Sequence, residues 1–140
     1  MSSPTVTASI TYRNARAAID WLVQVLGFKI HALYPGEGDT ILHSELTLGT
    51  GMVMVGTLPA FDNPYRQMIR LPNEVGGFVT LSLNLVVPDP DAVYDRAKAA
   101  NTTILMDIED KPYGGRGFSC RDAEGHIWHV GSYDPWQPKK

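Results

Sequence analysis

The chain has very little cysteine and no long apolar segment. Cys120 is the only cysteine among 140 residues, which excludes an intrachain disulfide and a zinc site built from several thiolates. This cysteine usage fits a reducing compartment, so we expect a cytoplasmic protein. No apolar run approaches the length of a membrane span, and the stretch from Met1 to Thr7 lacks the charged and apolar regions of a signal peptide. We therefore expect no membrane partner.

An excess of charge of one sign is also missing. Twelve basic against fifteen acidic residues leave a formal net charge of −3 without a basic stripe, so we expect no nucleic-acid partner. Hydrophobic residues at 44% and charged residues at 19% lie near globular averages, which excludes disorder and coiled coil. Ten prolines and thirteen glycines predict a fold rich in turns. The length is that of one domain.

The first half of the chain predicts the order β-α-β-β-β. Apolar residues alternate with polar ones over residues 5–12, as in a half-buried strand. Asn14 is a favourable N-cap, and apolar residues then recur at helical spacing until Gly27, a residue that tolerates the left-handed conformation at a helix end. Composition and turn residues predict three further strands over 28–34, 40–48 and 52–56.

The second half repeats that order. A strand is predicted over 80–87, a helix begins at Asp89-Pro90 and ends at Asn101, and strands follow over 104–109, 117–121 and 126–130. Residues 27 and 101, where the two helices end, lie 74 positions apart, and so do the turn glycines at 51 and 125. Two landmarks with the same spacing indicate one structural unit used twice.

These patterns predict an α+β fold in which two paired β-α-β-β-β modules form a curved mixed sheet around a cleft. We expect one domain over 1–140, with module one at about 5–57, a connecting strap at 58–78, module two at about 79–133 and a tail at 134–140. The strap is long and apolar, so we expect it to pack on the rim of the cleft. The tail contains Trp136 between two prolines, and the sequence leaves open whether it docks on its own subunit or on a partner's.

Alternation assigns each strand residue to one of two faces. We expect Leu42, Ser44 and Leu46 to face a helix, together with Met52, Met54 and the strand residue Trp128, which the pattern places in the core. The opposite face carries polar residues that line either the cleft or a solvated surface: Thr7, Ser9, His43, Glu45, Ser82 and Asn84.

The segments Tyr12–Leu22, Leu26-Gly27-Phe28 and Asp122–Trp128 resemble those of the vicinal oxygen chelate superfamily. Within it, His43–Leu46 with Gly51–Gly56, and Tyr113–Arg116, are similar to the glyoxalase/bleomycin-resistance-like branch. The resemblance covers nearly the whole chain. It implies the glyoxalase/bleomycin resistance/dihydroxybiphenyl dioxygenase fold, a small-molecule ligand and a homodimer.

In metal-dependent members of that superfamily, the ligands come from the first and last strand of each module. The resemblance puts those positions near Thr7 and Ser82 and at Val55 and His129 in this chain. Only His129 is a good ligand, since valine has no donor and hydroxyls bind zinc, nickel or iron poorly. We therefore expect no cofactor. The alternative is a divalent metal (Zn, Ni, Mn or Fe) held by His43, Glu45 and His129.

The candidate ligand-binding residues share a polar side chain at the expected cleft: His43, Glu45, Thr7, Ser9, Ser82, Asn84, Tyr113, Arg116 and His129. His43 and Glu45 are expected to hydrogen-bond each other or a ligand. Arg116 either holds a carboxylate or phosphate or makes a surface ion pair. Ser119 and Cys120 have no identifiable neighbouring base, so no nucleophile is predicted.

These observations favour a small-molecule binding protein that sequesters an amphipathic ligand in the cleft without a metal. The alternative is a divalent-metal-dependent lyase, isomerase or dioxygenase of the same superfamily. Whether the chain is an enzyme stays open, although the absence of a full ligand set favours a binding protein. If it is an enzyme, a glyoxalase-like lyase or a dioxygenase is the expectation.

Overall fold

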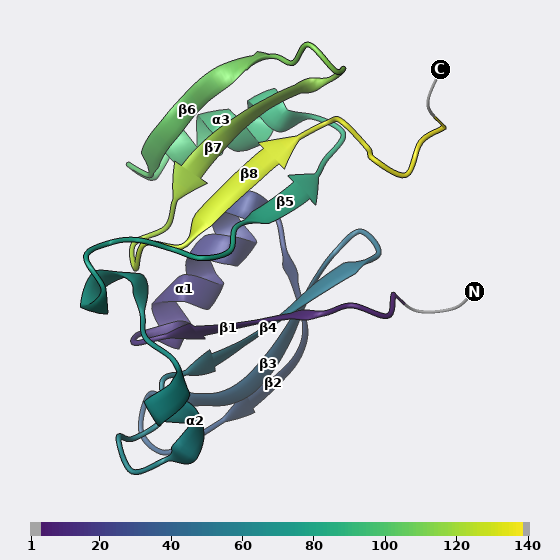
Figure 1. The fold of residues 1–140 in the computed structure, drawn as a ribbon. Coiled ribbons are helices and arrows are strands. Elements are labelled where there is room, and N and C mark those ends of the chain that lie inside the picture. Colours follow the sequence, from purple (N-terminus) through teal and green to yellow (C-terminus); the bar gives the residue numbers. More distant parts are fainter. Residues whose placement is uncertain (1–3, 139–140) are drawn as a thin grey trace. The chain divides into compact units, whose positions relative to one another are not determined.

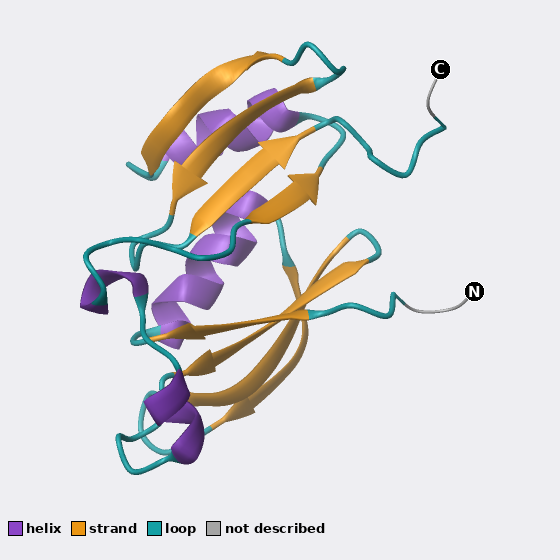
Figure 2. Ribbon diagram, viewed as in Figure 1, coloured by secondary structure: helices purple, strands orange, loops and turns teal. Residues whose placement is uncertain are grey.

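The computed structural model describes residues 4–138, which divide into two compact units after Gly76. Each unit holds one four-stranded mixed sheet with helices on it, so the fold is α+β as the sequence predicted (Figures 1 and 2). No described helix is long and apolar enough to cross a membrane.

The sheet of the first unit contains β1 (Ala8–Tyr12), β2 (Lys29–Pro35), β3 (Ile41–Leu48) and β4 (Gly51–Thr57) in the order β1-β4-β3-β2. β1 pairs with β4 in parallel, and the other neighbours are antiparallel. These four strands match the predicted ones to within a few residues at each end.

The helix α1 (Ala15–Trp21) continues into the π-helical turn η1 (Leu22–Leu26) and contacts β1 and β4. The Asn14 side chain accepts a hydrogen bond from the Ala17 N–H at 3.1 Å, which caps the first turn. Gly27 ends the helix with φ of 89°, a conformation that favours glycine. Both ends of this helix were therefore predicted from the sequence.

The stretch after β4 is organised by a buried arginine. It contains α2 (Pro64–Met68) and the 3₁₀ turn η2 (Pro72–Glu74). Arg66 is only 1% exposed; its guanidinium donates to Glu74 Oε2 at 2.6 Å and to the Ile69 carbonyl at 3.1 Å. The Leu71 N–H donates to Glu74 Oε1 at 2.8 Å. This N–H first, and then Arg66, hold the pKa of Glu74 below its ordinary value.

The second unit repeats the topology of the first. Its sheet contains β5 (Leu83–Val86), β6 (Thr103–Asp110), β7 (Arg116–Arg121) and β8 (Ile127–Gly131) in the order β5-β8-β7-β6. Only β5 and β8 are parallel neighbours. The helix α3 (Pro90–Ala99) covers one face of this sheet and contacts β6, β7 and β8 (Figure 1). The use of one unit twice, inferred from the spacing of turns, is confirmed.

The core of the second unit is built around Trp128, which is fully buried as predicted. Its indole N–H donates to Asp122 Oδ2 at 3.1 Å. The other carboxylate oxygen of Asp122 accepts from the Glu124 and His126 N–H groups, at 3.1 and 3.0 Å. Cys120 is also buried, and burial raises the pKa of its thiol to about 12. This thiol is therefore protonated and unreactive.

Three residues lie on the opposite strand face from the one expected. Leu42, expected against a helix, is 75% exposed, while Ile41 is 1% exposed. The pairing of β2 with β3 is irregular at this end, which shifts the alternation. Met52 and Met54 are half-buried, and the fully buried residues of β4 are Val53 and Val55.

Candidate ligand site on the second sheet

The second sheet has one face toward α3 and one face away from it. On the α3 side, Phe118 meets the ring of Tyr94 edge to face, at 5.2 Å between centroids. Ser119 follows Phe118 on β7 and so points to the opposite face, where it is 5% exposed. His129 is its ladder partner on β8, and Asn84 of β5 pairs with His129 on its other side. Three polar residues from three strands therefore lie in one row on the face opposite α3.

His129 is held between two hydroxyl groups. Its Nδ1 lies 2.6 Å from Ser119 Oγ and its Nε2 lies 3.0 Å from Ser82 Oγ. In either neutral tautomer of an imidazole, one ring nitrogen donates and the other accepts, so two hydroxyls can bond such a ring at the same time. The expectation that Ser119 has no neighbouring base is therefore wrong. The order of residues along the chain did not reveal the contact because the ladder register creates it.

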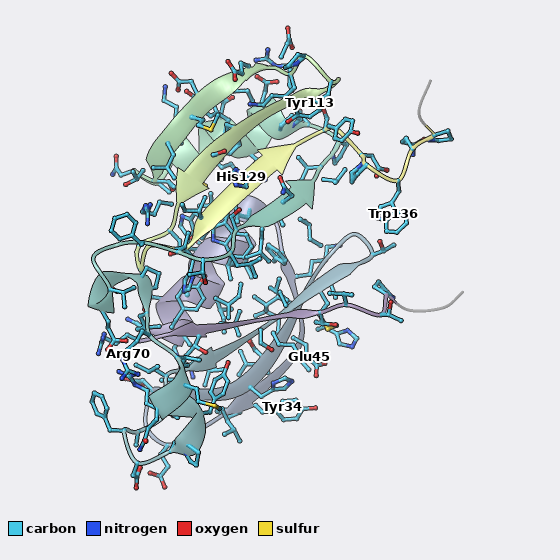
Figure 3. All side chains as sticks on the ribbon, viewed as in Figure 1. Tyr34, Glu45, Arg70, Tyr113, His129 and Trp136 are labelled. Atoms are coloured by element: carbon cyan, nitrogen blue, oxygen red, sulfur yellow. The ribbon has the colours of Figure 1, made fainter. Side chains whose placement is uncertain are left out.

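A cavity of about 650 Å³ opens on this face. Its lining combines the polar row with apolar and aromatic residues from the strands, the β6–β7 turn and the C-terminal segment, among them Asn84, Met106, Tyr113, Ser119, His129 and Trp136. Figure 3 shows His129 on β8, Tyr113 at the turn and Trp136 on the segment beyond β8. Of the predicted candidates, four line this cavity: Asn84, Tyr113, Arg116 and His129. Ser82 joins them through its hydrogen bond to His129.

The backbone directly after β8 is tied to the start of β7 and to the turn before it. The Ser132 N–H donates to the Arg116 carbonyl at 2.9 Å, and the Arg116 N–H donates to Ser132 Oγ at 3.0 Å. Gly115 has φ of 73°, and a Cβ there would lie 2.7 Å from the Tyr133 nitrogen. Only glycine allows the turn and the segment to approach so closely.

Arg116 makes the ion pair that was one of its two expected roles. Its Nε and Nη2 each donate to the Asp91 carboxylate at 3.0 Å, and its Nη1 donates to Asp110 Oδ1 at 3.2 Å. These hydrogen bonds raise the pKa of Arg116 and lower that of Asp91. Lys111, which also lines the cavity, lies 3.1 Å from Glu109 Oε1. Both cations of the lining are therefore paired with carboxylates.

The corresponding face of the first sheet carries a different group of residues. His43 Nε2 lies 2.9 Å from Glu45 Oε2, and the Tyr34 ring stacks on His43 with centroids 5.8 Å apart. The side chains of His43 and Glu45 are 39% and 28% exposed. Ser9 is exposed on β1, and Thr7 is exposed just before that strand. Figure 3 labels Tyr34 and Glu45 on this sheet.

The strand pairing shows that Val55 is not the counterpart of His129, although the spacing of 74 residues had suggested so. In the first unit Met54 pairs with Ser9 and Glu45, and in the second unit His129 pairs with Asn84 and Ser119. The counterpart of His129 is therefore Met54. The spacing of 74 fails here because the first hairpin turns through residues 49–50 and the second through 122–126.

The donor atoms on the second sheet do not fit a divalent metal. They comprise one imidazole, whose two nitrogens are both hydrogen-bonded, together with hydroxyls and an amide. Zinc, nickel and iron prefer several imidazole or carboxylate ligands. Within either unit, over residues 4–138, no three His, Cys, Asp or Glu side chains gather as a metal site would require.

Comparison with known proteins places the chain in a family. The model described as "Glyoxalase/Bleomycin resistance protein/Dioxygenase superfamily" matches residues 5–130. The chain belongs to this superfamily, and the resemblance seen in the sequence is confirmed.

Individual relatives agree with this membership. The crystal structure of TioX from Micromonospora sp. ML1 is 32% identical, with a TM-score of 0.70 over 92% of this chain and 98% of that one. Uncharacterized protein Rv0887c of Mycobacterium tuberculosis is 28% identical over 132 residues, which cover 91% of this chain and 74% of the relative. Lactoylglutathione lyase from Agrobacterium tumefaciens, 17% identical with a TM-score of 0.59 over 93% of both chains, shares the fold.

Proposed function

We propose that this chain is a small-molecule binding protein that holds an amphipathic ligand in the cavity of its second unit. The volume of about 650 Å³ carries the proposal, since ligand sites in proteins typically measure roughly 300–1,000 Å³. The polar row of Asn84, Ser119 and His129 gives hydrogen bonds at the base, and the aromatic residues supply apolar surface. A ligand with one polar and one apolar part matches this division.

We propose further that binding needs no metal ion. The support is the hydrogen bonding of His129, because a metal would have to displace a serine hydroxyl to reach either nitrogen. Sequestration in a cavity needs only shape and hydrogen bonds and involves no Lewis acid.

We also propose that the chain works as a homodimer in the cytoplasm. The support is the superfamily resemblance for the dimer and the single free, buried Cys120 for the reducing compartment. Size-exclusion chromatography with light scattering tests the dimer, and a monomer of 15.4 kDa at micromolar concentration would contradict it.

The binding proposal is tested by thermal-shift screening with aromatic, cationic and thiol-containing compounds. A ligand at 100 times its Kd stabilises the native state by about 2.7 kcal/mol, which gives a measurable rise in Tm. Val86→Trp is the blocking variant, because Val86 lines the cavity and is 46% exposed, so a larger ring enters the cavity without disturbing the core. Val6→Trp, at a position 85% exposed in the first unit, is the matched control.

We expect hits whose binding is lost in Val86→Trp and kept in Val6→Trp. The proposal fails if no compound binds or if Val86→Trp binds every hit as the wild type does. Metal independence has its own test, which is metal analysis of protein purified without a histidine tag. Stoichiometric zinc, nickel, manganese or iron that disappears in His129→Ala would favour a metal-dependent lyase, isomerase or dioxygenase instead.

A further inference from the structure

The charges around the cavity disfavour an anionic ligand. Lys111 and Arg116 are the two basic residues of the described lining, and each is already paired. Their partners are three carboxylates, on Glu109, Asp91 and Asp110. A ligand carboxylate or phosphate would therefore meet no unpaired cation in the lining, and it would have to compete with these carboxylates for Lys111 and Arg116.

The rim offers flat aromatic surface. Tyr113 and Tyr133 meet edge to face at 4.8 Å between centroids, and Tyr113 is 62% exposed. Trp136 lines the cavity and is 91% exposed. Met106 adds a thioether, which contacts aromatic rings favourably. An aromatic ligand that stacks on these rings would remove apolar area from water. The stacking contact itself would add to the free energy of binding.

Trp136 is presented on a short structured turn. Its backbone N–H donates to Asp134 Oδ1 at 2.9 Å, and the Gln137 amide donates to Asp134 Oδ2 at 3.2 Å. The segment is fixed at its base by the two hydrogen bonds between Ser132 and Arg116. These contacts order the backbone that carries Trp136, so less backbone conformational entropy is lost when the indole binds a ligand.

From these observations we propose that the cavity selects a flat aromatic ring system without a negative charge, and that Trp136 is the residue that stacks on it. This inference rests on the proposed function, since it names the class of ligand for the same cavity. An uncharged polar substituent on the ring would hydrogen-bond to the side chain of Asn84, which is exposed and lines the cavity.

Three probes that share one ring and differ in charge test the inference by calorimetry at pH 7.5: 2-naphthylmethanol, 2-naphthylmethylammonium and 2-naphthoate. We expect the neutral and cationic probes to bind and the anion to bind at least about tenfold more weakly, which corresponds to about 1.4 kcal/mol. Trp136→Ala should weaken the neutral probe by about tenfold or more, Trp136→Phe should retain most of its affinity because it keeps a ring, and Leu42→Ala in the first unit should change nothing.

A second pair of variants tests the role of charge directly. Asp91→Asn removes one carboxylate from Arg116 and should increase the affinity for 2-naphthoate. Asp95→Asn removes the same charge from an exposed position of the same helix and should leave that affinity unchanged. If Asp91→Asn lowers Tm and leaves the affinity for 2-naphthoate unchanged, the contact is purely structural and the charge argument fails.

The inference is overturned if 2-naphthoate binds as tightly as the alcohol, or if Trp136→Ala binds the alcohol as the wild type does. If no naphthyl probe binds while other compounds bind and are blocked by Val86→Trp, the ligand class is wrong and the binding function stands. If nothing binds the cavity at all, both proposals fail.

Discussion

Arg116 and Asp91 are joined by two parallel hydrogen bonds of 3.0 Å, although they lie far apart in the sequence. The planar guanidinium matches the two carboxylate oxygens, and a lysine ammonium cannot reproduce this geometry. The contact ties the first turn of α3 to β7 beside the cavity. It therefore helps to fix the position of the helix on the sheet.

We expect Arg116→Lys to lower Tm by a few degrees at pH 7. A lysine ammonium cannot donate in parallel to both oxygens of Asp91 and also to Asp110. Thermal denaturation followed by circular dichroism measures the change. Arg16→Lys, at an exposed position of α1, is the matched control and should behave as wild type. Equal Tm values for the two variants would show that the paired geometry contributes nothing to stability.

The pairing of Glu74 predicts a pH-dependent stability. The folded pKa of Glu74 lies below its ordinary value of 4.5, so its contribution is present above that pH and is lost as the pH falls through the folded pKa. Glu74→Gln should therefore have a lower Tm than wild type at pH 7, with a difference that shrinks below about pH 4.5. Glu37→Gln, on an exposed turn, provides the control. A difference that stays constant down to pH 3 would contradict the linkage.

Removing the indole N–H of Trp128 should destabilise the second unit. In Trp128→Phe, Asp122 loses a buried hydrogen bond, and such a loss costs about 1–3 kcal/mol; the smaller ring adds a further cost. Urea denaturation measures the free energy of unfolding. Trp136→Phe, which changes a ring that is 91% exposed, is the control and should change stability little. Equal midpoints for both variants would count against the role of the Asp122 contact.

The pair of His43 and Glu45 is expected to add little stability. Both side chains are partly exposed, and exposed pairs contribute about 0–1 kcal/mol. Glu45→Gln keeps the shape of the side chain and should leave Tm nearly unchanged. Leu46→Ala, at a fully buried neighbouring position, should lower stability by about 2–5 kcal/mol. If Glu45→Gln unfolds the protein, Glu45 belongs to a structural network.

Local signals in the sequence were sufficient to predict most of the fold. The caps at Asn14 and Asp89 act as expected, since each side chain accepts a hydrogen bond from the first turn of its helix. Turn residues and the alternation of apolar with polar residues predicted every strand to within a few residues. The same alternation placed Trp128 on the buried face of its strand. These features depend on neighbours within a few positions of the chain, where propensity and periodicity carry the information.

The candidate site depends on contacts that local patterns cannot reveal. The hydrogen bond between Ser119 and His129 follows from the register of β7 against β8, and the register depends on the length of the turn between them. The pair of Arg116 and Asp91 follows from the packing of α3 on the sheet. Leu42 is exposed because the pairing of β2 with β3 is irregular at this end. Such an irregularity depends on the neighbouring strand and cannot be read from the alternation of residues along β3 itself.

The two sheets share one pattern of strand pairing, but they carry different residues on the face that points away from the helix. Ser9, Glu45 and Met54 occupy the places that Asn84, Ser119 and His129 hold in the second unit. The helix-facing residues of both sheets form the cores and are independent of these choices. The polar row could therefore be introduced into the first sheet by three substitutions, one at each of these ladder positions. The residues of the two cores would not have to be changed.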